Sequence, residues 1–136
     1  MNPYYNQNYT REEINRILYK IKKCIDNNRF TIALNQNRQE NINFINEYNI
    51  RSDRQKSILL QIKPEDFCHS LQNTKPGYEY EVLYVFVPQV QLFHADGKEE
   101  TVDVYTKFNV IDLPGGIRTV VISFHKRNKP VEYLFR

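Results

Sequence analysis

Residues 102–126, "VDVYTKFNVIDLPGGIRTVVISFHK", contain the pattern that decides the fold. Apolar and polar side chains alternate in the runs on both sides of the turn sequence "LPGG". A period of two residues is typical of a β-strand whose two faces meet different surroundings. The two runs therefore predict neighbouring antiparallel strands joined by a short turn.

Alternation also assigns the side chains of these strands to the two faces of a sheet. The apolar face is predicted to carry Val102, Val104, Thr106, Phe108, Val110, Val120, Ile122 and Phe124, with Arg118 at its start. The opposite face is predicted to carry Asp103, Tyr105, Lys107, Asn109, Thr119, Val121, Ser123 and His125. If the apolar faces pack on helices, the polar faces coincide as one surface, which is either the solvated side of a half-buried sheet or a site.

The residues before this strand pair predict helices first and further strands later. Thr10 and Glu13 form a capping-box pattern at the start of a helix that ends near residues 26–28. Residues 29–34 form a strand or an extended entry to the next helix. Further helices are expected over 37–49, where Ile42, Ile45 and Tyr48 share a face, over 52–62, and over 63–71, where Pro64 stands in the first turn.

The second half is expected to be a sheet, which makes the fold class α+β with N-terminal helices packed on one face of a C-terminal antiparallel β-sheet. Residues 81–87 read as a strand, and the runs around Asp96-Gly97 read as a hairpin. Residues 131–135 are a candidate for a last strand. Residues 1–9 are interpreted as a flexible leader, and residues 10–136 as a single domain.

Composition favours an ordinary globular domain rather than a membrane or secreted one. The chain has 136 residues, a net charge of +3, and no apolar stretch that resembles a signal peptide or a membrane span, so a cytoplasmic location is expected. Cys24 and Cys68 are interpreted as small apolar fillers. The three histidines (69, 94, 125) lack metal-ligand spacing, and no phosphate-binding loop occurs, so neither a metal nor a cofactor is expected.

The polar face and the charges that follow it are of the kinds needed for RNA cleavage. Without a metal ion, this reaction uses the neighbouring 2′-OH as nucleophile and needs a base, an acid, and donors for the charge on the phosphorane. Histidine serves both proton roles because its ordinary pKa lies near 6.5. After His125 come three cations that suit an RNA backbone: Lys126, Arg127 and Lys129. The alternative for this run is a solvated turn after an edge strand.

Three stretches resemble, in order and spacing, segments of the MqsR (motility quorum-sensing regulator) toxins. Residues 58–71, "ILLQIKPEDFCHSL", are similar to the family's I-x-x-L-x-x-x-D-F-x-K-S segment, and residues 83–88, "LYVFVP", to its D-V-Y-x-P strand end. The pair "VDVYTKFNV…VVISFHK" is similar to its V-Y-x-K-I-x-V and V-x-I-V-S-F-K strands. Over residues 12–128, the resemblance implies a RelE-like fold and a metal-independent endoribonuclease that cleaves mRNA and has an antitoxin as its protein partner.

The resemblance also implies a set of catalytic positions. Tyr105 falls on the family's catalytic tyrosine, and Lys107 on the lysine two residues later. His125 and His69 fall where the family has catalytic lysines, so the chain departs from the pattern by two Lys-to-His changes. Leu83 stands where the family has a glutamine.

Two other functions remain open at this stage. One is a binding protein with a toxin-like fold that has lost its activity. The other is an anti-CRISPR protein of a mobile genetic element, which acts against a host RNA-guided nuclease by degrading its guide RNA or by blocking the effector. An enzyme needs Tyr105, His125 and His69 close together, whereas an inactive binder does not.

Overall fold

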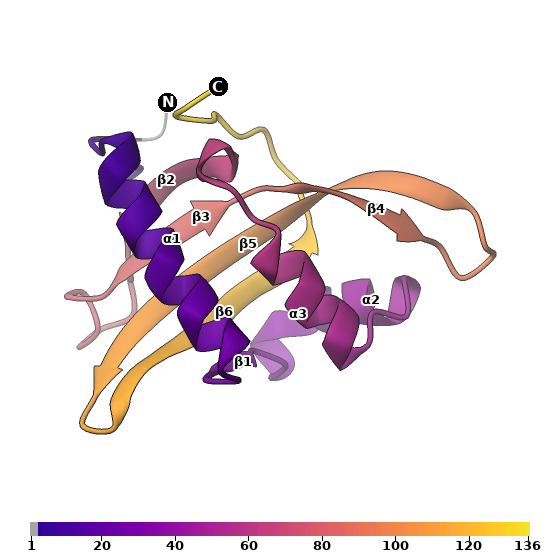
Figure 1. The fold of residues 1–136 in the computed structure, drawn as a ribbon, viewed down its shortest axis with the longest axis horizontal. Coiled ribbons are helices and arrows are strands. Elements are labelled where there is room, and N and C mark those ends of the chain that lie inside the picture. The colour runs from indigo at the N-terminus through magenta and orange to yellow at the C-terminus, as the bar shows by residue number, and fades with distance from the viewer. Residues whose placement is uncertain (1–2) are drawn as a thin grey trace.

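The computed structural model describes residues 3–136 and has an α+β fold, with the helices in the N-terminal half and most strands in the C-terminal half (Figure 1). The helices are α1 (Arg11–Asp26), α2 (Gln39–Glu47) and α3 (Ser52–Leu60), with 3-10 turns η1 (Gln36–Arg38) and η2 (Pro64–Asp66). The strands are β1 (Phe30–Ile32), β2 (Phe67–Gln72), β3 (Val82–Phe86), β4 (Gln89–Phe93), β5 (Glu99–Leu113) and β6 (Gly116–Lys126). In this part of the chain no helix has both the length and the apolar character that crossing a bilayer requires.

The sheet has the strand order β1-β6-β5-β3-β2, and β4 pairs with the first residues of β5. All pairs among β2 to β6 are antiparallel, as the alternating pattern predicts. Strand β1 instead runs parallel to β6, which corrects the expectation of a purely antiparallel sheet. A parallel pair needs a long connection between its strands, and here residues 33–115 provide it.

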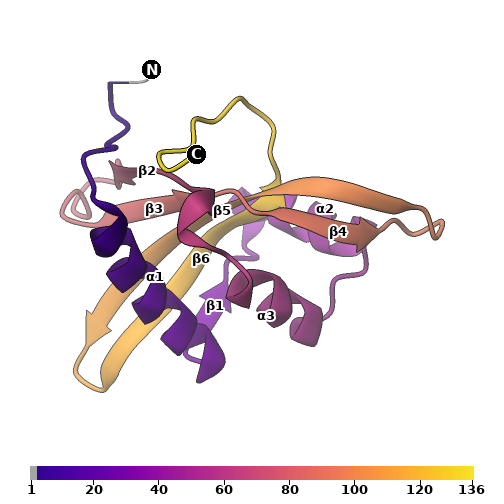
Figure 2. The ribbon, with the colours of Figure 1, turned by 45° about the horizontal axis from the view of Figure 1, so that its top comes forward.

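The helices cover one face of the sheet, as predicted. In Figure 2, α1 and α3 lie beneath the sheet, while the yellow C-terminal segment passes over its other side. The main core joins these helices to the sheet through fully buried side chains, among them Ile14, Ile21, Ile25, Ile58, Leu59, Phe86, Phe108 and Phe124. The predicted capping box is present, because Thr10 and Glu13 each bond the other's backbone N–H at the start of α1.

Helix α2 turns a different face to the core from the one predicted. Asn41, Phe44 and Tyr48 are buried, whereas Ile42 and Ile45 are only half-buried. Two contacts with β6 explain this rotation. The Phe44 ring packs edge-on against Phe124 at 5.4 Å between centroids, and the Asn41 side chain hydrogen-bonds the backbone of β6.

Residues 63–71 are not a helix, which corrects the prediction based on Pro64. The helical turn stops at Asp66, whose carboxylate accepts the backbone N–H of Lys63. The chain then continues as strand β2, which pairs antiparallel with β3. Its residues Phe67, Cys68, His69 and Ser70 are all buried because both faces of this part of the sheet are covered, and a strand buried on both faces lacks the alternation by which strands are recognised.

A β-bulge divides the face assignment of β6. Tyr105 pairs with His125 and Lys107 with Ser123, but Phe108 then pairs with Val121, so Ile122 is the extra residue. Beyond the bulge the alternation reverses. Val121 therefore lies in the helix-side core. Val120, which was predicted to lie there, pairs with Asn109 and so lies on the opposite face.

The C-terminal segment is not a strand, which corrects the candidate strand at 131–135. It crosses the face of the sheet that the helices leave open and is held there by three kinds of contact. The Leu134 N–H donates to Phe67 O, and the Tyr133 hydroxyl donates to Val87 O. The Arg136 guanidinium donates to the carboxylate of Asp66 at 2.8 Å.

Residues 3–9, in the segment expected to be a flexible leader, lie along β2, and residues 1–2 lie outside the described residues. Asn6 and Ser70 exchange both backbone hydrogen bonds, as in a short antiparallel bridge. The Gln7 side chain donates to Cys68 O and to Glu132 O, which ties the leader to both β2 and the C-terminal segment. The two ends of the chain together cover a second small core of Cys68, Val85, Val87 and Tyr105.

Candidate functional site

Two side chains of the predicted polar face, Tyr105 and His125, lie against each other. Tyr105 of β5 and His125 of β6 are directly paired in the register, and their rings stack at 5.4 Å between centroids and 17° between planes. Both point to the face away from the helices, as predicted from alternation. The prediction that they occupy adjacent strands with side chains on the same face is therefore confirmed.

A second row of site residues crosses the sheet next to this pair. His69 pairs with Val85, Val85 with Lys107, and Lys107 with Ser123, so these four side chains share the same face. Lys107 lies two positions from Tyr105 along β5. His69 lies two strands from Lys107, which the spacing of neighbouring strands makes roughly 10 Å. The structure thus brings all four predicted catalytic positions onto one surface: Tyr105, Lys107, His125 and His69.

This surface is not the open, solvated face expected from the pattern, because the ends of the chain cover it. Tyr105 is 5% exposed and His69 is 2% exposed. The Tyr5 ring lies flat on the His69 ring, and the Lys129 ammonium lies 5.4 Å from the Tyr105 ring and 5.9 Å from the Tyr5 ring. Sequence alternation shows which side chains share a face, but not that a distant segment returns to cover it.

The surroundings of His125 assign the roles of its two ring nitrogens. Nδ1 lies 2.8 Å from the carbonyl oxygen of Lys126, and a carbonyl only accepts, so Nδ1 carries the proton of the neutral ring. Nε2 has no hydrogen-bond partner in the described chain and is not sealed from solvent. The neutral ring therefore presents an unprotonated nitrogen that can take up a proton.

A carboxylate stands beside this histidine. Glu40 Oε2 lies 3.6 Å from Nδ1 of His125 and accepts a hydrogen bond from the Asn128 side chain at 2.7 Å. This contact places a carboxylate on the Nδ1 side of the ring, opposite the free Nε2. Glu40 belongs to α2, and nothing in the local sequence pattern connects it with the strand pair.

The other two members of the group have pKa values displaced by burial. Burial raises the pKa of the Tyr105 phenol to about 12, so at neutral pH this hydroxyl is a hydrogen-bond donor and not a base. Burial also lowers the pKa of the Lys107 ammonium, and the positive charges of Arg38 and Lys129 lower it further. An ammonium in this position gives up its proton more readily than a solvated lysine does.

His69 has surroundings that keep it neutral. Burial, together with the charges of Lys129 and Lys107, lowers its pKa to about 4. Its Nε2 is a buried atom without a hydrogen-bond partner in the described chain. The arrangement is thus compatible with binding by His69, but makes it a poor proton donor at neutral pH.

The cations predicted to hold RNA differ in their partners. Lys126 lies between the carboxylates of Glu47 and Glu100, and Arg127 pairs with Asp103 at 3.2 Å. Lys129 has no carboxylate partner among the described residues, and the same is true of Lys107 and Arg38. These three, called here the unpaired cations, lie close enough to influence one another's titration or that of His69. Lys107 and Arg38 are half-buried and Lys129 is exposed, and a group of neighbouring cations without an acid partner attracts an anion.

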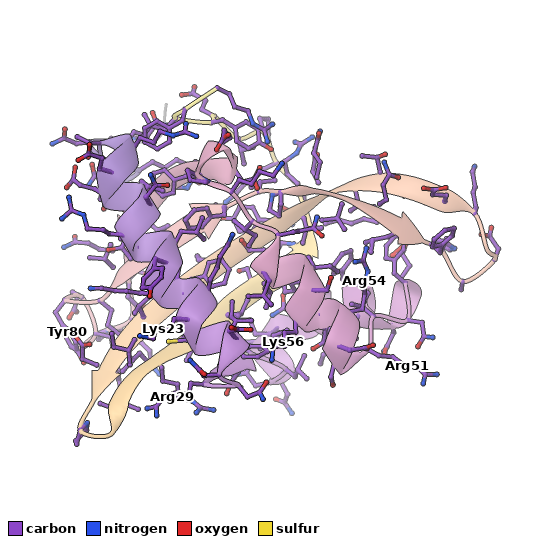
Figure 3. All side chains as sticks on the ribbon, in the orientation of Figure 1. Lys23, Arg29, Arg51, Arg54, Lys56 and Tyr80 are labelled. Carbon is purple, nitrogen blue, oxygen red and sulfur yellow. The ribbon has the colours of Figure 1, made fainter. Side chains whose placement is uncertain are left out.

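Other basic side chains lie on the helix side of the molecule, and some of them have structural partners. Figure 3 labels Lys23, Arg29, Arg51, Arg54 and Lys56 around the ends of α1 and α3. Lys56 donates to Asp26 O and to Asn28 Oδ1, and Arg54 donates to Gln91 O. Lys56 and Arg54 thereby join neighbouring elements, and the labelled charges on the helix side serve as a reference set for electrostatic tests.

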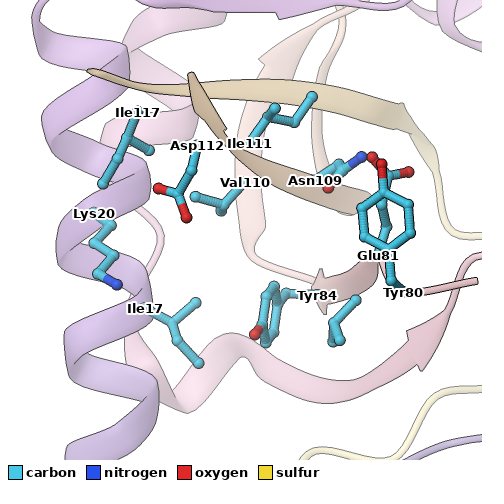
Figure 4. A pocket seen from close by; sticks show the side chains of 11 residues that line it. Ile17, Lys20, Tyr80, Glu81, Tyr84, Asn109, Val110, Ile111, Asp112 and Ile117 are labelled. Carbon is cyan, nitrogen blue, oxygen red and sulfur yellow. The ribbon is translucent and has the colours of Figure 1, made fainter. Parts of the chain in front are cut away.

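A cavity of about 430 Å³ lies beside the site's sheet, at the far end of β5 (Figure 4). Ile17 and Lys20 of α1 form one wall, and Tyr84 and Asp112 belong to the sheet side. It contains none of the four predicted catalytic positions. Within residues 3–136, no three His, Cys, Asp or Glu side chains are placed to hold a metal ion.

Comparisons with known proteins gave no match among family models, curated proteins or solved structures.

Proposed function

We propose that this protein is a metal-independent endoribonuclease of toxin type, which cleaves RNA through attack by the 2′-OH. The observation that carries the proposal is the stacked Tyr105–His125 pair with Lys107 beside it, on a surface where three cations lack acid partners. Such a surface attracts a phosphate and holds proton-transfer groups next to it. The predicted resemblance to the MqsR toxins and to the RelE-like fold is part of this proposal.

His125 acts as the general base in the first step. Its Nε2 removes the proton from the 2′-OH, whose oxygen then attacks the neighbouring phosphorus. The resulting imidazolium is stabilised by Glu40, 3.6 Å from Nδ1, and by the bond from Nδ1 to Lys126 O. A new 2′-O–P bond forms in this step, and negative charge develops on the phosphorane oxygens.

Lys107 and Tyr105 complete the reaction. The Tyr105 hydroxyl, protonated at neutral pH, donates a hydrogen bond to a phosphorane oxygen. The bond from phosphorus to the 5′-oxygen breaks, and that oxygen receives a proton from the Lys107 ammonium, whose pKa is lowered by burial. The products are an RNA that ends in a 2′,3′-cyclic phosphate and an RNA that begins with a 5′-OH. Lys129 and Arg38 hold the phosphate.

The test is cleavage of a labelled RNA in EDTA, with the end groups of the products identified by mass spectrometry. We expect 2′,3′-cyclic phosphate or 3′-phosphate ends, because the 2′-OH is the nucleophile. A matched oligonucleotide with one 2′-deoxy sugar at the cleaved position resists cleavage there and only there. Products with 3′-OH and 5′-phosphate ends would contradict the proposal.

The second function, an inhibitor with a toxin-like fold that blocks a protein or RNA partner without catalysis, is favoured by one observation. The chain ends cover the candidate catalytic surface, and they are held by the bridge between Asn6 and Ser70 and by the ion pair between Arg136 and Asp66. An enzyme has to open this cover to admit RNA, whereas an inhibitor does not. If the folded protein cleaves no RNA but binds a guide RNA or an RNA-guided nuclease, the second function is correct.

A further inference from the structure

A ring of the leader lies on His69 in the manner of a stacked nucleobase. The centroids of the Tyr5 and His69 rings are 3.6 Å apart, and their planes differ by 8°. This is closer and more nearly parallel than the edge-on aromatic pairs of the core, such as Phe44–Phe124 at 5.4 Å and 68°. Parallel stacking on an aromatic platform is the usual way in which proteins hold the bases of single-stranded RNA.

His69 has a polar atom that the folded chain leaves unused. The side chain is 2% exposed, and its Nε2 is buried without a partner in the described chain. Native proteins rarely leave a buried polar atom unbonded, so such an atom calls for an explanation. A hydrogen bond to a ring nitrogen lies in the plane of the ring, so a ribose hydroxyl of a bound nucleotide, and not the base stacked on the ring face, would satisfy this atom.

The position of His69 relative to the cations fits one nucleotide. His69 and Lys107 lie in the same cross-strand row, two strands apart. Lys129 lies between the two stacked pairs, with its ammonium near the Tyr5 ring and near the Tyr105 ring. A base on His69 therefore has its phosphate directed toward Lys129 and Lys107.

The contacts of the leader allow Tyr5 to leave without unfolding the domain. Residues 3–9 join the sheet at its β2 edge through the bridge between Asn6 and Ser70 and through side-chain bonds of Gln7 and Tyr9, and Tyr4 takes part in a further interaction. None of residues 3–8 belongs to the helix-side core. Displacement of this segment exposes the His69 ring while α1 and the sheet stay in place.

We propose that His69 is the platform for a nucleobase of single-stranded RNA, and that Tyr5 occupies this subsite until the base displaces it. The choice of ligand rests on the proposed function. In this arrangement the leader covers the catalytic surface and also selects ligands that carry a base. A phosphate alone does not displace the stacked Tyr5 ring. His69 then binds the base, and the proton chemistry belongs to His125, Lys107 and Tyr105.

The test measures binding of 2′-O-methyl RNA hexamers, which cannot be cleaved because the 2′ oxygen is blocked. The probes are the four homohexamers and an abasic hexamer with the same phosphates. We expect wild type to prefer a base-containing hexamer, and His69→Ala to lose about tenfold or more in affinity for it but little for the abasic one. His69→Phe keeps a stacking ring and retains most of the affinity, which separates loss of stacking from loss of folding.

Two further measurements test the role of Tyr5. Tyr5→Ala should bind the base-containing hexamer a few-fold more tightly, because the competing ring is gone, whereas Tyr19→Ala on the exposed side of α1 should change nothing. The nuclear Overhauser effect between the Tyr5 and His69 rings should disappear when the hexamer binds. Weaker binding by Tyr5→Ala, or an effect that persists in the complex, would overturn the displacement.

Failure of this inference differs from failure of the proposed function. If wild type cleaves RNA but His69→Ala loses the same affinity for both kinds of hexamer, or none, no base lies on His69 and the proposed function stands. If wild type neither binds nor cleaves any RNA, both proposals are wrong.

Discussion

His125 and Tyr105 show how much the sequence alone indicates at the scale of single residues. Alternation within two strands was sufficient to predict that these side chains share a face, and the register places them opposite each other. Their partners could not be predicted in this way. Glu40 comes from a helix, Lys129 from an irregular segment and Tyr5 from the leader. Such contacts depend on tertiary packing, which no local period encodes.

Replacement of His125 by lysine tests whether this side chain transfers a proton. Histidine ordinarily titrates near pH 6.5 and lysine near 10.4. If residue 125 removes the 2′-OH proton, the rising limb of the pH–rate profile of His125→Lys should move to higher pH, with a lower rate at pH 7. The measurement is single-turnover cleavage from pH 5 to 9. An unchanged profile would mean that residue 125 acts only through its charge.

The low pKa of His69 predicts a dependence of stability on pH. The unfolded chain binds a proton at this position below about pH 6.5, whereas the folded protein binds it only near pH 4. The free energy of unfolding is therefore lowered as the pH falls from 6.5 to 4, by up to about 3 kcal/mol from this group.

Urea unfolding at several pH values checks this, with His69→Gln as the matched variant because its side chain does not titrate. The difference in unfolding free energy between the two proteins should shift in favour of His69→Gln as the pH falls. Parallel curves for the two proteins would show that His69 titrates normally in the folded state.

At the scale of elements, capping and periodicity predicted α1, α3, β3 and the two hairpins well. The error at residues 63–71 has a physical cause. Pro64 and the acids after it do begin a helical turn, but Phe67 to Ser70 are buried on both faces of a sheet. Neither the double burial nor the bulge at Ile122 leaves a periodic signal. Both depend on elements distant in the sequence.

Asn41 is the side chain that fixes α2 to the strands beside the site. Its amide donates to Ala33 O at 2.9 Å and to Ile122 O at 3.0 Å, and its oxygen accepts the N–H of Phe124 at 2.8 Å. These bonds hold the bulge of β6 just before His125. Asn41 is 1% exposed, so water does not replace it.

Asn41→Ala should therefore lower the free energy of unfolding by about 2–4 kcal/mol, because buried backbone groups lose their partner. Asn43→Ala, at an exposed position of the same helix, is the control and should change it by less than about 0.5 kcal/mol. Chemical denaturation measures both. Equal effects for the two variants would contradict the assigned role of Asn41.

At the scale of the whole molecule, the net charge of +3 indicates less about an RNA site than the positions of the basic groups that lack acid partners. Some basic groups are neutralised by carboxylates or donate to carbonyls, as Lys126 and Lys56 do. The unpaired cations Arg38, Lys107 and Lys129 gather where the two chain ends cross the sheet. Lys126 and Arg127 were predicted to hold RNA because they follow His125 in the sequence, but ion pairing depends on which acids the fold brings near.

The salt dependence of RNA binding distinguishes these groups. For single strands the slope of log K against log salt is about −0.7 per phosphate contact, so Ala at all three unpaired cations should reduce its magnitude by about 2. A matched triple replacement of Lys23, Arg51 and Lys56 on the helix side (Figure 3) should leave the slope unchanged. The reverse result would place the RNA on the helices.

The central claim, that His125 cleaves RNA as a proton-transfer group, is tested most directly by one rate measurement. A labelled RNA is cleaved in EDTA under single-turnover conditions by wild type, by His125→Ala and by the control His94→Ala, with folding checked by melting curves. We predict a rate for His125→Ala that is lower by roughly 10²–10⁴-fold, and a rate for His94→Ala close to that of wild type. Full activity in a folded His125→Ala, or no cleavage of any RNA by folded wild type, would contradict the account.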